Sequence, residues 1–290
     1  MKTTTRYTTT MLTLALLLTL GGCVKDELHD TPHPDTGKIT VTADWTDRGE
    51  GVNIPASWHI VMGDYTGTET GATHSPDYLF NPGSYTLAVY NPADGITVSG
   101  TTATVATADG SFITGIPGWL FTSVQEVAIE ADTDYELTAV MRQQVRELTL
   151  VIKPAGDAAD RIESIEGTLS GAAGTLDFAT GTHGTPSEVE LHFTKITEGD
   201  DAGKWMATVR LLGIAGDAQR LTATLTYTDG NPQPTSLNSD LTSALNSFND
   251  GKTAPLTLGG TLAETPSEAG FTGEITDWET VDGGGVDAEM

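Results

Sequence analysis

Residues 220–227 read Arg-Leu-Thr-Ala-Thr-Leu-Thr-Tyr, a run in which every second side chain is apolar. Successive side chains of a β-strand point to opposite faces of the sheet, so this period of two predicts a strand with one face in a core and the other in solvent. Threonine suits such a strand because its β-branched side chain packs well on a pleated, half-exposed surface. The stretch therefore favours an antiparallel sheet over a helix.

The same alternation recurs along most of the chain, in short runs separated by Gly, Pro, Asp and Asn. It predicts further strands at residues 38–45, 58–62, 84–90, 124–129, 135–141, 146–152, 188–193, 205–211 and 274–279. Residues 155–162 predict a turn. Residues 239–248 predict a short helix, because Leu241, Leu245 and Phe248 would share one face behind a Ser or Asp cap. The sequence thus indicates an all-β protein.

The length of 290 residues suffices for two domains of ordinary size, each with its own core. Because Thr-rich strands dominate, we expect two tandem antiparallel β-sandwich domains, at residues 38–144 and 145–280. No Pro/Gly-rich linker marks the boundary, near Arg142 to Arg146, which predicts closely packed domains. The acidic, Gly-rich stretch 281–290 is expected to be a disordered tail that assembly does not need.

The first residues have the pattern of a lipoprotein signal peptide. Lys2 and Arg6 precede an apolar run at residues 11–20, which ends in the motif Leu-Gly-Gly-Cys. An apolar core of about ten residues is too short to span a bilayer, which takes roughly 20. We therefore expect a signal peptide at residues 1–22 that is cut before Cys23.

Cys23 is the only cysteine of the chain, although secreted proteins normally pair their thiols or have none. Acylation explains this residue, because a diacylglycerol thioether with an amide-linked chain supplies enough acyl tails for stable anchoring. Residues 23–37 then form a lipidated, flexible linker. The charged stretch Val24-Lys25-Asp26-Glu27 resembles the export signal of surface-exposed outer-membrane lipoproteins of Bacteroidota, and an ordinary solvated tether is the alternative.

A strong negative charge limits the possible partners. The chain has 40 acidic and 14 basic residues, which gives a formal net charge of −26. This charge excludes nucleic acid as a partner and repels anionic lipid head groups, so the acyl chains must supply the membrane affinity. On a cell-surface protein an acidic excess mostly serves solubility and only occasionally calcium binding.

No catalytic or metal-binding pattern stands out. Among the histidines only the pair His29 and His33 has a spacing of interest, and a solvated linker explains it. Asp200 and Asp201 would suit a calcium ion, but the alternating oxygen pattern of a calcium loop is missing, and a hairpin turn is the better interpretation. Paired carboxylates for glycoside hydrolysis are a property of the fold and stay open. We expect a non-enzymatic protein without cofactors.

Four segments resemble the FimB-type anchor and accessory subunits of the type V fimbriae of Bacteroidota. They are the first strand at residues 41–45, the proline-glycine strand entry at 80–91, the stretch 165–178 that opens the second domain, and the last strand at 273–278. The resemblance implies two transthyretin-like β-sandwich domains on a lipid anchor, in a non-catalytic part of a surface fimbria. It also implies that the partners are fimbrial subunits, joined when an extended segment of one adds a strand to the sheet edge of another.

Three functional interpretations stay open. The first is a fimbrial anchor or minor subunit that keeps its lipid on the outer membrane. The second is a polymerising stalk or tip subunit, in which an arginine-specific protease cuts after Arg48 and removes the first strand with the lipid, although a turn arginine is a sufficient explanation of Arg48. The third is a surface glycan-binding lipoprotein, which would show Trp58, Trp119 or Trp205 together on an exposed face rather than in a core.

Overall fold

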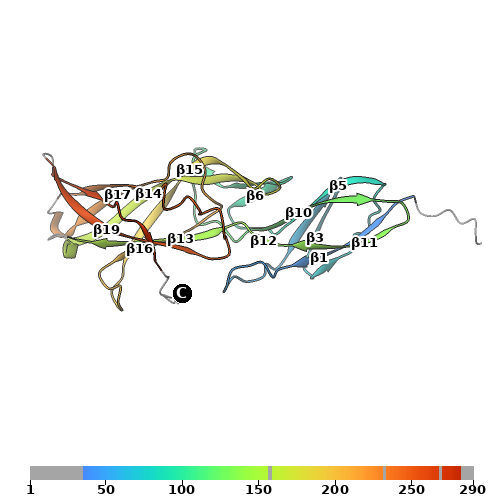
Figure 1. The fold of residues 1–290 in the computed structure, drawn as a ribbon, viewed down its shortest axis with the longest axis horizontal. Helices are drawn as coiled ribbons and strands as arrows, with labels where there is room; N and C mark the ends of the chain where they lie inside the picture. Colours follow the sequence, from blue (N-terminus) through green and yellow to red (C-terminus); the bar gives the residue numbers. More distant parts are fainter. Residues whose placement is uncertain (1–34, 156–158, 231–232, 268–269, 282–290) are drawn as a thin grey trace, which may run out of the picture.

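The computed structural model describes residues 35–155, 159–230, 233–267 and 270–281. Within these residues the only helical segments are short 3-10 turns at Ala159–Arg161 and Thr228–Gly230, and neither could cross a membrane. The prediction of an all-β protein is confirmed. Figure 1 shows two bodies of unequal size arranged end to end along the long axis.

The smaller body consists of two separate sheets. The first has the strand order β11 (Asp134–Val140), β1 (Lys38–Asp44) and β4 (Thr73–His74). The second has the order β12 (Arg142–Gln143), β10 (Phe121–Ile129), β5 (Gly83–Tyr90), β2 (Trp58–Met62) and β3 (Tyr65–Glu69). Both sheets pack on one core, in which the bulkiest fully buried side chains are Trp58, Phe80 and Phe121. The alternating apolar residues of these strands therefore face inward, as their period of two predicts.

The larger body is built on one extended sheet. Its strands follow the order β6 (Ile96–Ser99), β7 (Thr102–Val105), β14 (Ile162–Asp177), β17 (Arg220–Tyr227), β18 (Thr235–Asp240), β20 (Gly270–Glu274), β19 (Leu256–Ser267), β13 (Arg146–Pro154), β16 (Trp205–Leu211), β15 (Thr182–Lys195), β9 (Phe112–Ile113) and β8 (Thr107–Ala108), and β21 (Glu279–Thr280) pairs with β19. The additional pairing of β14 with β15 joins two distant points of this path. The strands between them therefore surround a single core.

The segment between β5 and β10 belongs to the larger body, although strands of the smaller body flank it in the sequence. Strand β7 pairs with β14, and β9 pairs with β15. Ala103, Val105 and Leu120 lie in the larger core. The chain therefore crosses between the bodies at both ends of this segment and again at residues 142–146.

The predicted helix at residues 239–248 is wrong. Strand β18 runs to Asp240, and consecutive turns follow, in which the Leu245 N–H donates to Leu241 O and the Phe248 N–H donates to Leu245 O. The three apolar residues of the prediction are fully buried, so their shared face is real. Thr, Ser and Asn fill most positions between them and are poor helix formers, so the apolar spacing alone does not produce a helix.

The predicted strand at residues 274–279 is also wrong. Strand β20 ends at Glu274 and β21 begins at Glu279. Between them Ile275 is buried, and Trp278 donates from Nε1 to Ser239 Oγ at 2.7 Å. The apolar alternation here belongs to a segment that leaves β20 and returns to pair with β19.

Candidate functional site

The first strand is an inner strand with one weakly covered side. Strand β1 pairs in parallel with β11 along its whole length, but with β4 only at Val41 and Thr42. Beyond these residues the hydroxyl groups of Thr40 and Ser75 lie 2.9 Å apart. Because β4 is so short, the contacts that fix the β4 loop also determine how well this edge of β1 is covered.

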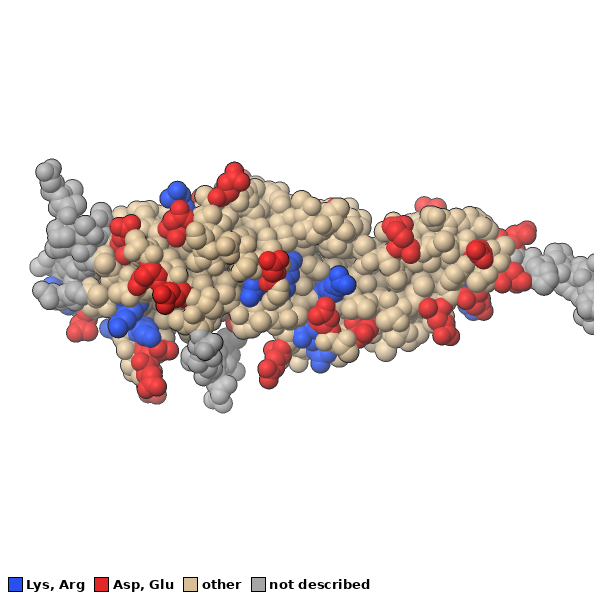
Figure 2. Space-filling model, in the orientation of Figure 1, with Lys and Arg blue, Asp and Glu red and all other residues tan. Residues whose placement is uncertain are grey.

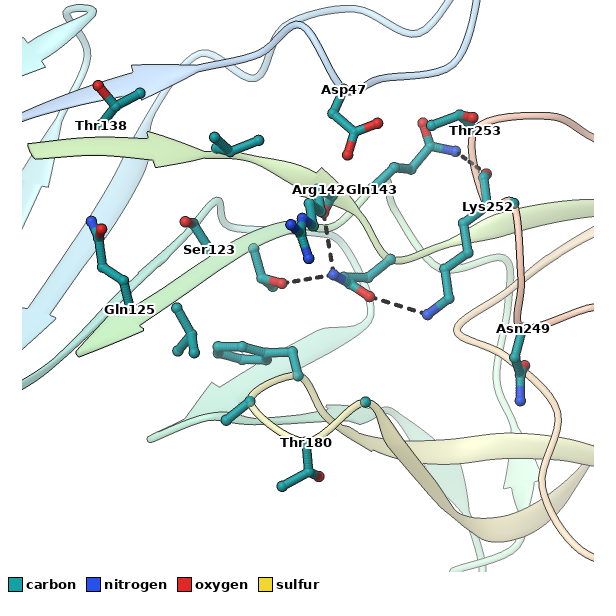
Figure 3. Close-up of a pocket in the computed structure, with 18 residues that line it drawn as sticks. Asp47, Ser123, Gln125, Thr138, Arg142, Gln143, Thr180, Asn249, Lys252 and Thr253 are labelled. Carbon is teal, nitrogen blue, oxygen red and sulfur yellow. Dashed lines mark hydrogen bonds between the residues drawn. The ribbon is translucent and has the colours of Figure 1, made fainter.

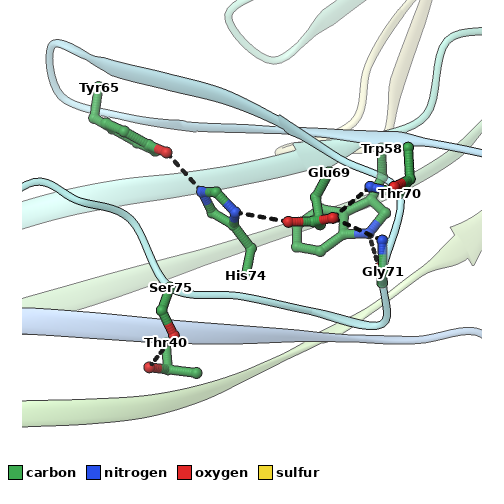
Figure 4. Close-up of polar contacts among 8 residues, drawn as sticks. All are labelled: Thr40, Trp58, Tyr65, Glu69, Thr70, Gly71, His74 and Ser75. Carbon is green, nitrogen blue, oxygen red and sulfur yellow. Dashed lines mark hydrogen bonds and ion pairs between the residues drawn. The ribbon is translucent and has the colours of Figure 1, made fainter.

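A hydrogen-bonded group holds this loop (Figure 4). Glu69 Oε1 accepts from the backbone N–H groups of Thr70 and Gly71 at 2.6 and 2.7 Å, and Glu69 Oε2 lies 3.1 Å from His74 Nδ1. His74 Nε2 lies 2.6 Å from the hydroxyl of Tyr65. The N–H of Gly71, then that of Thr70 and the His74 ring, hold the pKa of the Glu69 carboxyl below its ordinary value.

The hydrogen-bonded chain from Glu69 through His74 to Tyr65 resembles a catalytic relay, but the pKa of the Tyr65 hydroxyl is shifted in the wrong direction for one. Burial and the nearby Glu69 carboxylate raise the pKa of the Tyr65 hydroxyl, whereas an activated nucleophile needs a lowered pKa. Trp58 donates from Nε1 to Gly71 O at 2.8 Å beside this group. The hydrogen bonds of these residues fasten the β4 loop.

The candidate cleavage site at Arg48 lies in a closed turn after β1. The Arg48 side chain is exposed, but Nη1 donates to Trp45 O at 2.7 Å and Nε donates to Val52 O at 3.1 Å. Gly49 is buried, and its N–H donates to Gln143 Oε1 at 2.8 Å. A Cβ at Gly49 would lie 2.5 Å from the carbonyl oxygen of Thr253. The peptide bond after Arg48 is thus held against the larger body.

The same contact region fixes the joint between the bodies. Gln143 Nε2 donates to Lys252 O at 2.7 Å. Arg146 is buried, and its guanidinium donates to the carbonyl oxygens of Ala254, Phe248 and Asp250 at 2.7, 2.9 and 2.9 Å. Together these side chains hold the loop at residues 247–254 against the crossing at residues 142–146.

A cleft of about 770 Å³ lies beside this joint (Figure 3). The smaller body lines it with residues 122–125 of β10, with Thr138 and Val140 of β11, and with Asp47. The larger body adds the turn at residues 178–181 and the loop at 249–253. Strand β10 has a described strand partner on this side only at Phe121 and Thr122, and β11 has none there. The cleft therefore opens along two unpaired sheet edges.

Basic side chains are unusually placed around the cleft. Figure 2 shows acidic residues over the whole visible face and several basic ones near its middle, where the bodies meet, with acidic side chains beside them. Arg142 and Lys252 both line the cleft. Lys252 Nζ donates to Gln144 Oε1 at 3.1 Å and lies 3.2 Å from His183 Nε2. Desolvation lowers the pKa of Lys252 to about 8 and, together with the Lys252 charge, lowers that of His183 to about 4.

The three tryptophans considered for sugar stacking do not share an exposed face. Trp58 lies in the smaller core and Trp205 in the larger core, at 2% and 4% exposure. Trp119 is half-buried, packs against both cores and lies under the Arg210 guanidinium, 5.1 Å from its ring centre. Their role is packing, which is the alternative that the sequence left open.

Asp200 and Asp201 lie in a turn between β15 and β16, where the Gly203 N–H donates to Ile196 O at 2.8 Å and Lys204 forms an ion pair with Asp201. Within the described parts of the chain, no three His, Cys, Asp or Glu residues are grouped as metal ligands would be. Cys23, the predicted signal peptide at residues 1–22, the histidines 29 and 33, and residues 282–290 lie outside the described residues.

Sequence reasoning did not identify Lys252, His183 or Phe178 as candidate site residues. Their positions in the chain carry no motif, and Lys252 reaches Gln144 across 108 positions. Only the fold brings these segments to one cleft. The sequence has only 14 basic residues against 40 acidic ones, so a place where basic side chains cluster is a candidate binding site for an anion.

A family model matches most of the chain. This model, described as the fimbrillin-A associated anchor proteins Mfa1 and Mfa2, matches residues 62–283. No curated protein sequence matches the chain.

Solved structures share the fold. The fimbrial anchor protein Mfa2 from Porphyromonas gingivalis has a TM-score of 0.56 at 14% identity, over 84% of this chain and 97% of that chain. A candidate adhesin from Bacteroides ovatus has a TM-score of 0.54 at 17% identity, over 87% and 96%. A candidate polysaccharide-binding protein from Bacteroides thetaiotaomicron has a TM-score of 0.53 at 10% identity, over 80% and 93%. Identities this low show a common fold alone.

Proposed function

Because the chain belongs to the family of the fimbrillin-A associated anchor proteins, we propose that it is a lipid-anchored subunit that stays at the base of a fimbria. The family makes it a fimbria-associated protein of the cell surface. In this proposal Cys23 carries the lipid after residues 1–22 are removed, and the lipid holds the protein on the outer face of the outer membrane. The role is structural and needs neither catalytic residues nor a cofactor.

The closed turn at Arg48 is the observation that favours an anchor over a polymerising subunit. A protease that cuts after arginine must bind the residues around the cut in an extended form. To become extended, this turn loses both bonds of the Arg48 guanidinium and the bond from Gly49 to Gln143, and Gly49 must leave its buried position. Strand β1 therefore stays attached, and with it the lipid.

The experiment is a mass measurement of the N-terminal peptide in two samples, the detergent-extracted outer membrane and sheared fimbriae. We expect an acylated peptide beginning at Cys23 in the membrane sample and no chain beginning at Gly49 in either. A chain that begins at Gly49 in sheared fimbriae would show instead that the first strand is removed and that the protein polymerises.

A second experiment isolates the turn. Folded protein is treated with an arginine-specific protease, and cutting after Arg48 is followed over time. Gln143→Ala removes the acceptor of the Gly49 N–H and should speed this cut severalfold. Gln125→Ala, the same change at a position that does not touch the turn, should leave the rate unchanged. Equal rates in all three proteins would contradict the protective role of the turn.

We further propose that other subunits join by adding a strand at the edge of β3. This edge strand reads Tyr-Thr-Gly-Thr-Glu and lacks the Lys or Pro that usually protects an open edge. Met62 and Tyr65 close a two-residue hairpin, so the backbone groups of Thr66 and Thr68 point away from β2. Main-chain hydrogen bonds from these residues can hold an extended segment of a partner.

This edge can be tested by Thr66→Pro, which removes one outward N–H, against Thr66→Val, which keeps it. Fimbriae should be lost from cells with the proline variant and retained with the valine variant, while both proteins still reach the surface. Normal fimbriae in the proline variant would exclude β3 as the joint.

The division into two transthyretin-like domains, residues 38–144 and 145–280, belongs to the same proposal. The segment between β5 and β10 then reaches across from the first domain to the second. The acidic tail at residues 281–290 has no part in assembly. Fimbriae should therefore form normally after its deletion, and their loss would contradict this statement.

A further inference from the structure

The cleft between the bodies contains a cation, Lys252, that has no acidic partner among the described residues. Lys252 contacts only neutral groups there, the Gln144 amide oxygen and the His183 ring. Among the described residues no carboxylate lies within ion-pair distance of Lys252 or Arg142. Withdrawing a lysine from water is costly unless a counter-charge is present. In a chain with 40 acidic residues, the missing partner marks a place where an external anion fits.

The other walls of the cleft narrow the kind of anion. Asp47 also lines the cleft, and Figure 3 shows its carboxylate on the side of Arg142 and Gln143, away from the Lys252 ammonium group. A ligand made only of anionic groups would be repelled by Asp47, whereas one that also carries hydroxyl groups can donate to it. Gln125 Nε2 is a buried donor without a hydrogen-bond partner, in the wall formed by β10.

The remaining wall is apolar. Phe178 and Val140 both line the cleft, Val140 is 38% exposed, and Phe178 packs from its other side against the larger core. The C–H faces of sugar rings pack on such surfaces while their hydroxyl groups meet polar side chains, and a volume of about 300–1,000 Å³ is usual for small-molecule sites. Charge, hydroxyl acceptor and apolar wall together match one chemical class.

We propose that this cleft binds an acidic saccharide, with a sugar carboxylate at Lys252 and Arg142, ring hydroxyl groups at Asp47, and a ring face on Phe178. The proposal does not depend on the anchor role, since the cleft faces solvent in any assembly that leaves β10 and β11 free. In this proposal the cleft between the bodies, rather than the tryptophans packed in the cores, binds the glycan.

The test uses affinity electrophoresis of the full mature chain, in detergent and at about 0.15 M salt, where long-range repulsion between the acidic protein and an acidic polymer is largely screened. The probes are polygalacturonate, neutral dextran and polyglutamate. Polygalacturonate alone should retard the protein, because dextran lacks the carboxylate and polyglutamate lacks the ring hydroxyl groups.

Variants assign the binding to the cleft. Lys252→Met should weaken the binding of polygalacturonate about tenfold, as expected for one charge-assisted hydrogen bond. Lys153→Met removes the same charge from an exposed position on β13 and should have no effect. Because Lys252→Met also affects the joint, Asp47→Ala provides an independent variant on an exposed loop, and it should weaken binding as well.

Three outcomes would overturn the proposal. They are the absence of retardation by polygalacturonate, equal retardation by polyglutamate, and tighter binding of polygalacturonate by Asp47→Ala. The second would show that the cleft takes an acidic peptide instead. The third would show that Asp47 repels the ligand rather than accepting its hydroxyl groups.

Discussion

The two bodies of the molecule bury the apolar faces of their sheets in different ways. In the larger body the pairing of β14 with β15 lets the strands surround one core, which gathers more than twice as many buried apolar residues as the smaller core. In the smaller body two short sheets face each other, and β3, β10 and β11 keep unpaired edges among the described strands. The difference indicates that stability resides mainly in the larger body and that interactions are left to the smaller one.

The difference in stability between the two bodies is best tested with substitutions that disrupt one core at a time. Trp58 is 2% exposed in the smaller core, and Trp58→Ala should cost about 3–5 kcal/mol of its folding free energy. Because the small core has few other contacts to compensate, we expect the smaller body to unfold while the larger one stays folded. Thermal unfolding followed by circular dichroism, with limited proteolysis, measures this.

Leu150→Ala is the matched change in the larger core, where Leu150 is fully buried. It should lower the transition of the larger body and leave that of the smaller one in place. If either variant shifts both transitions equally, the two bodies form a single cooperative unit and the comparison fails.

The joint gives the next largest effect. Arg146→Met leaves the carbonyl oxygens of Ala254, Phe248 and Asp250 without their donor, and water can replace only part of this loss. We expect about 3 kcal/mol of destabilisation in urea unfolding, with faster hydrogen exchange in the loop at residues 247–254. Arg210→Met, which removes only a cation–π contact with Trp119, should cost about 1 kcal/mol or less.

Trp119 tests how strongly the two bodies are coupled, because it packs against both cores. Trp119→Ala should cost about 2 kcal/mol, less than a fully buried tryptophan, and should widen the gap between the two thermal transitions. Trp278→Ala serves as the control, since Trp278 packs against the larger core only. Equal widening in both variants would show that Trp119 does not couple the bodies.

The smallest effect is expected from the protonation of Glu69 in acid, which acts on the smaller body. The folded-state pKa of the Glu69 carboxyl is lower than its ordinary value of 4.5, so its contribution to stability is present above that pH and is lost as the pH falls through the folded pKa. The urea midpoint of the smaller body should therefore fall less in Glu69→Gln than in the natural chain between pH 7 and about pH 3. A Glu69→Gln protein with an unchanged pH dependence would show that the carboxylate does not hold the β4 loop.

The alternation of apolar residues predicted many strands, but it missed short ones such as β7 and also β14, which glycines interrupt. Strand β14 was not predicted as a strand, because its stretch Ser-Gly-Ala-Ala-Gly has no clear period. Gly171 explains the irregularity: it has a φ of +79° at a bulge between β14 and β15, and a Cβ there would lie 2.7 Å from Ala218 O. A sequence shows the glycine but not the neighbouring loop before β17 that leaves no room for a side chain.

The candidate site could be predicted only in part. Arg48 was recognisable as a position where a protease could cut, but its bonds to Trp45 and Val52 depend on the geometry of the turn. The tryptophans were the obvious candidates for sugar binding, and burial in two separate cores removes them from that role. The cleft depends on contacts between residues about 70 to 110 positions apart, which no local pattern encodes.

The parallel pairing of β1 with β11 has a mechanical consequence. Lys38 begins β1 at the end that lies away from the larger body, while Val140 ends β11 next to the joint (Figure 1). Tension between the membrane tether and the larger body would therefore enter at Lys38 and leave through Val140. It would load the hydrogen bonds between the strands in shear, all together, rather than peel them apart one at a time. Resistance to forced unfolding depends on the unfolding rate, and we expect strand β1 to detach most slowly when it is pulled in this direction.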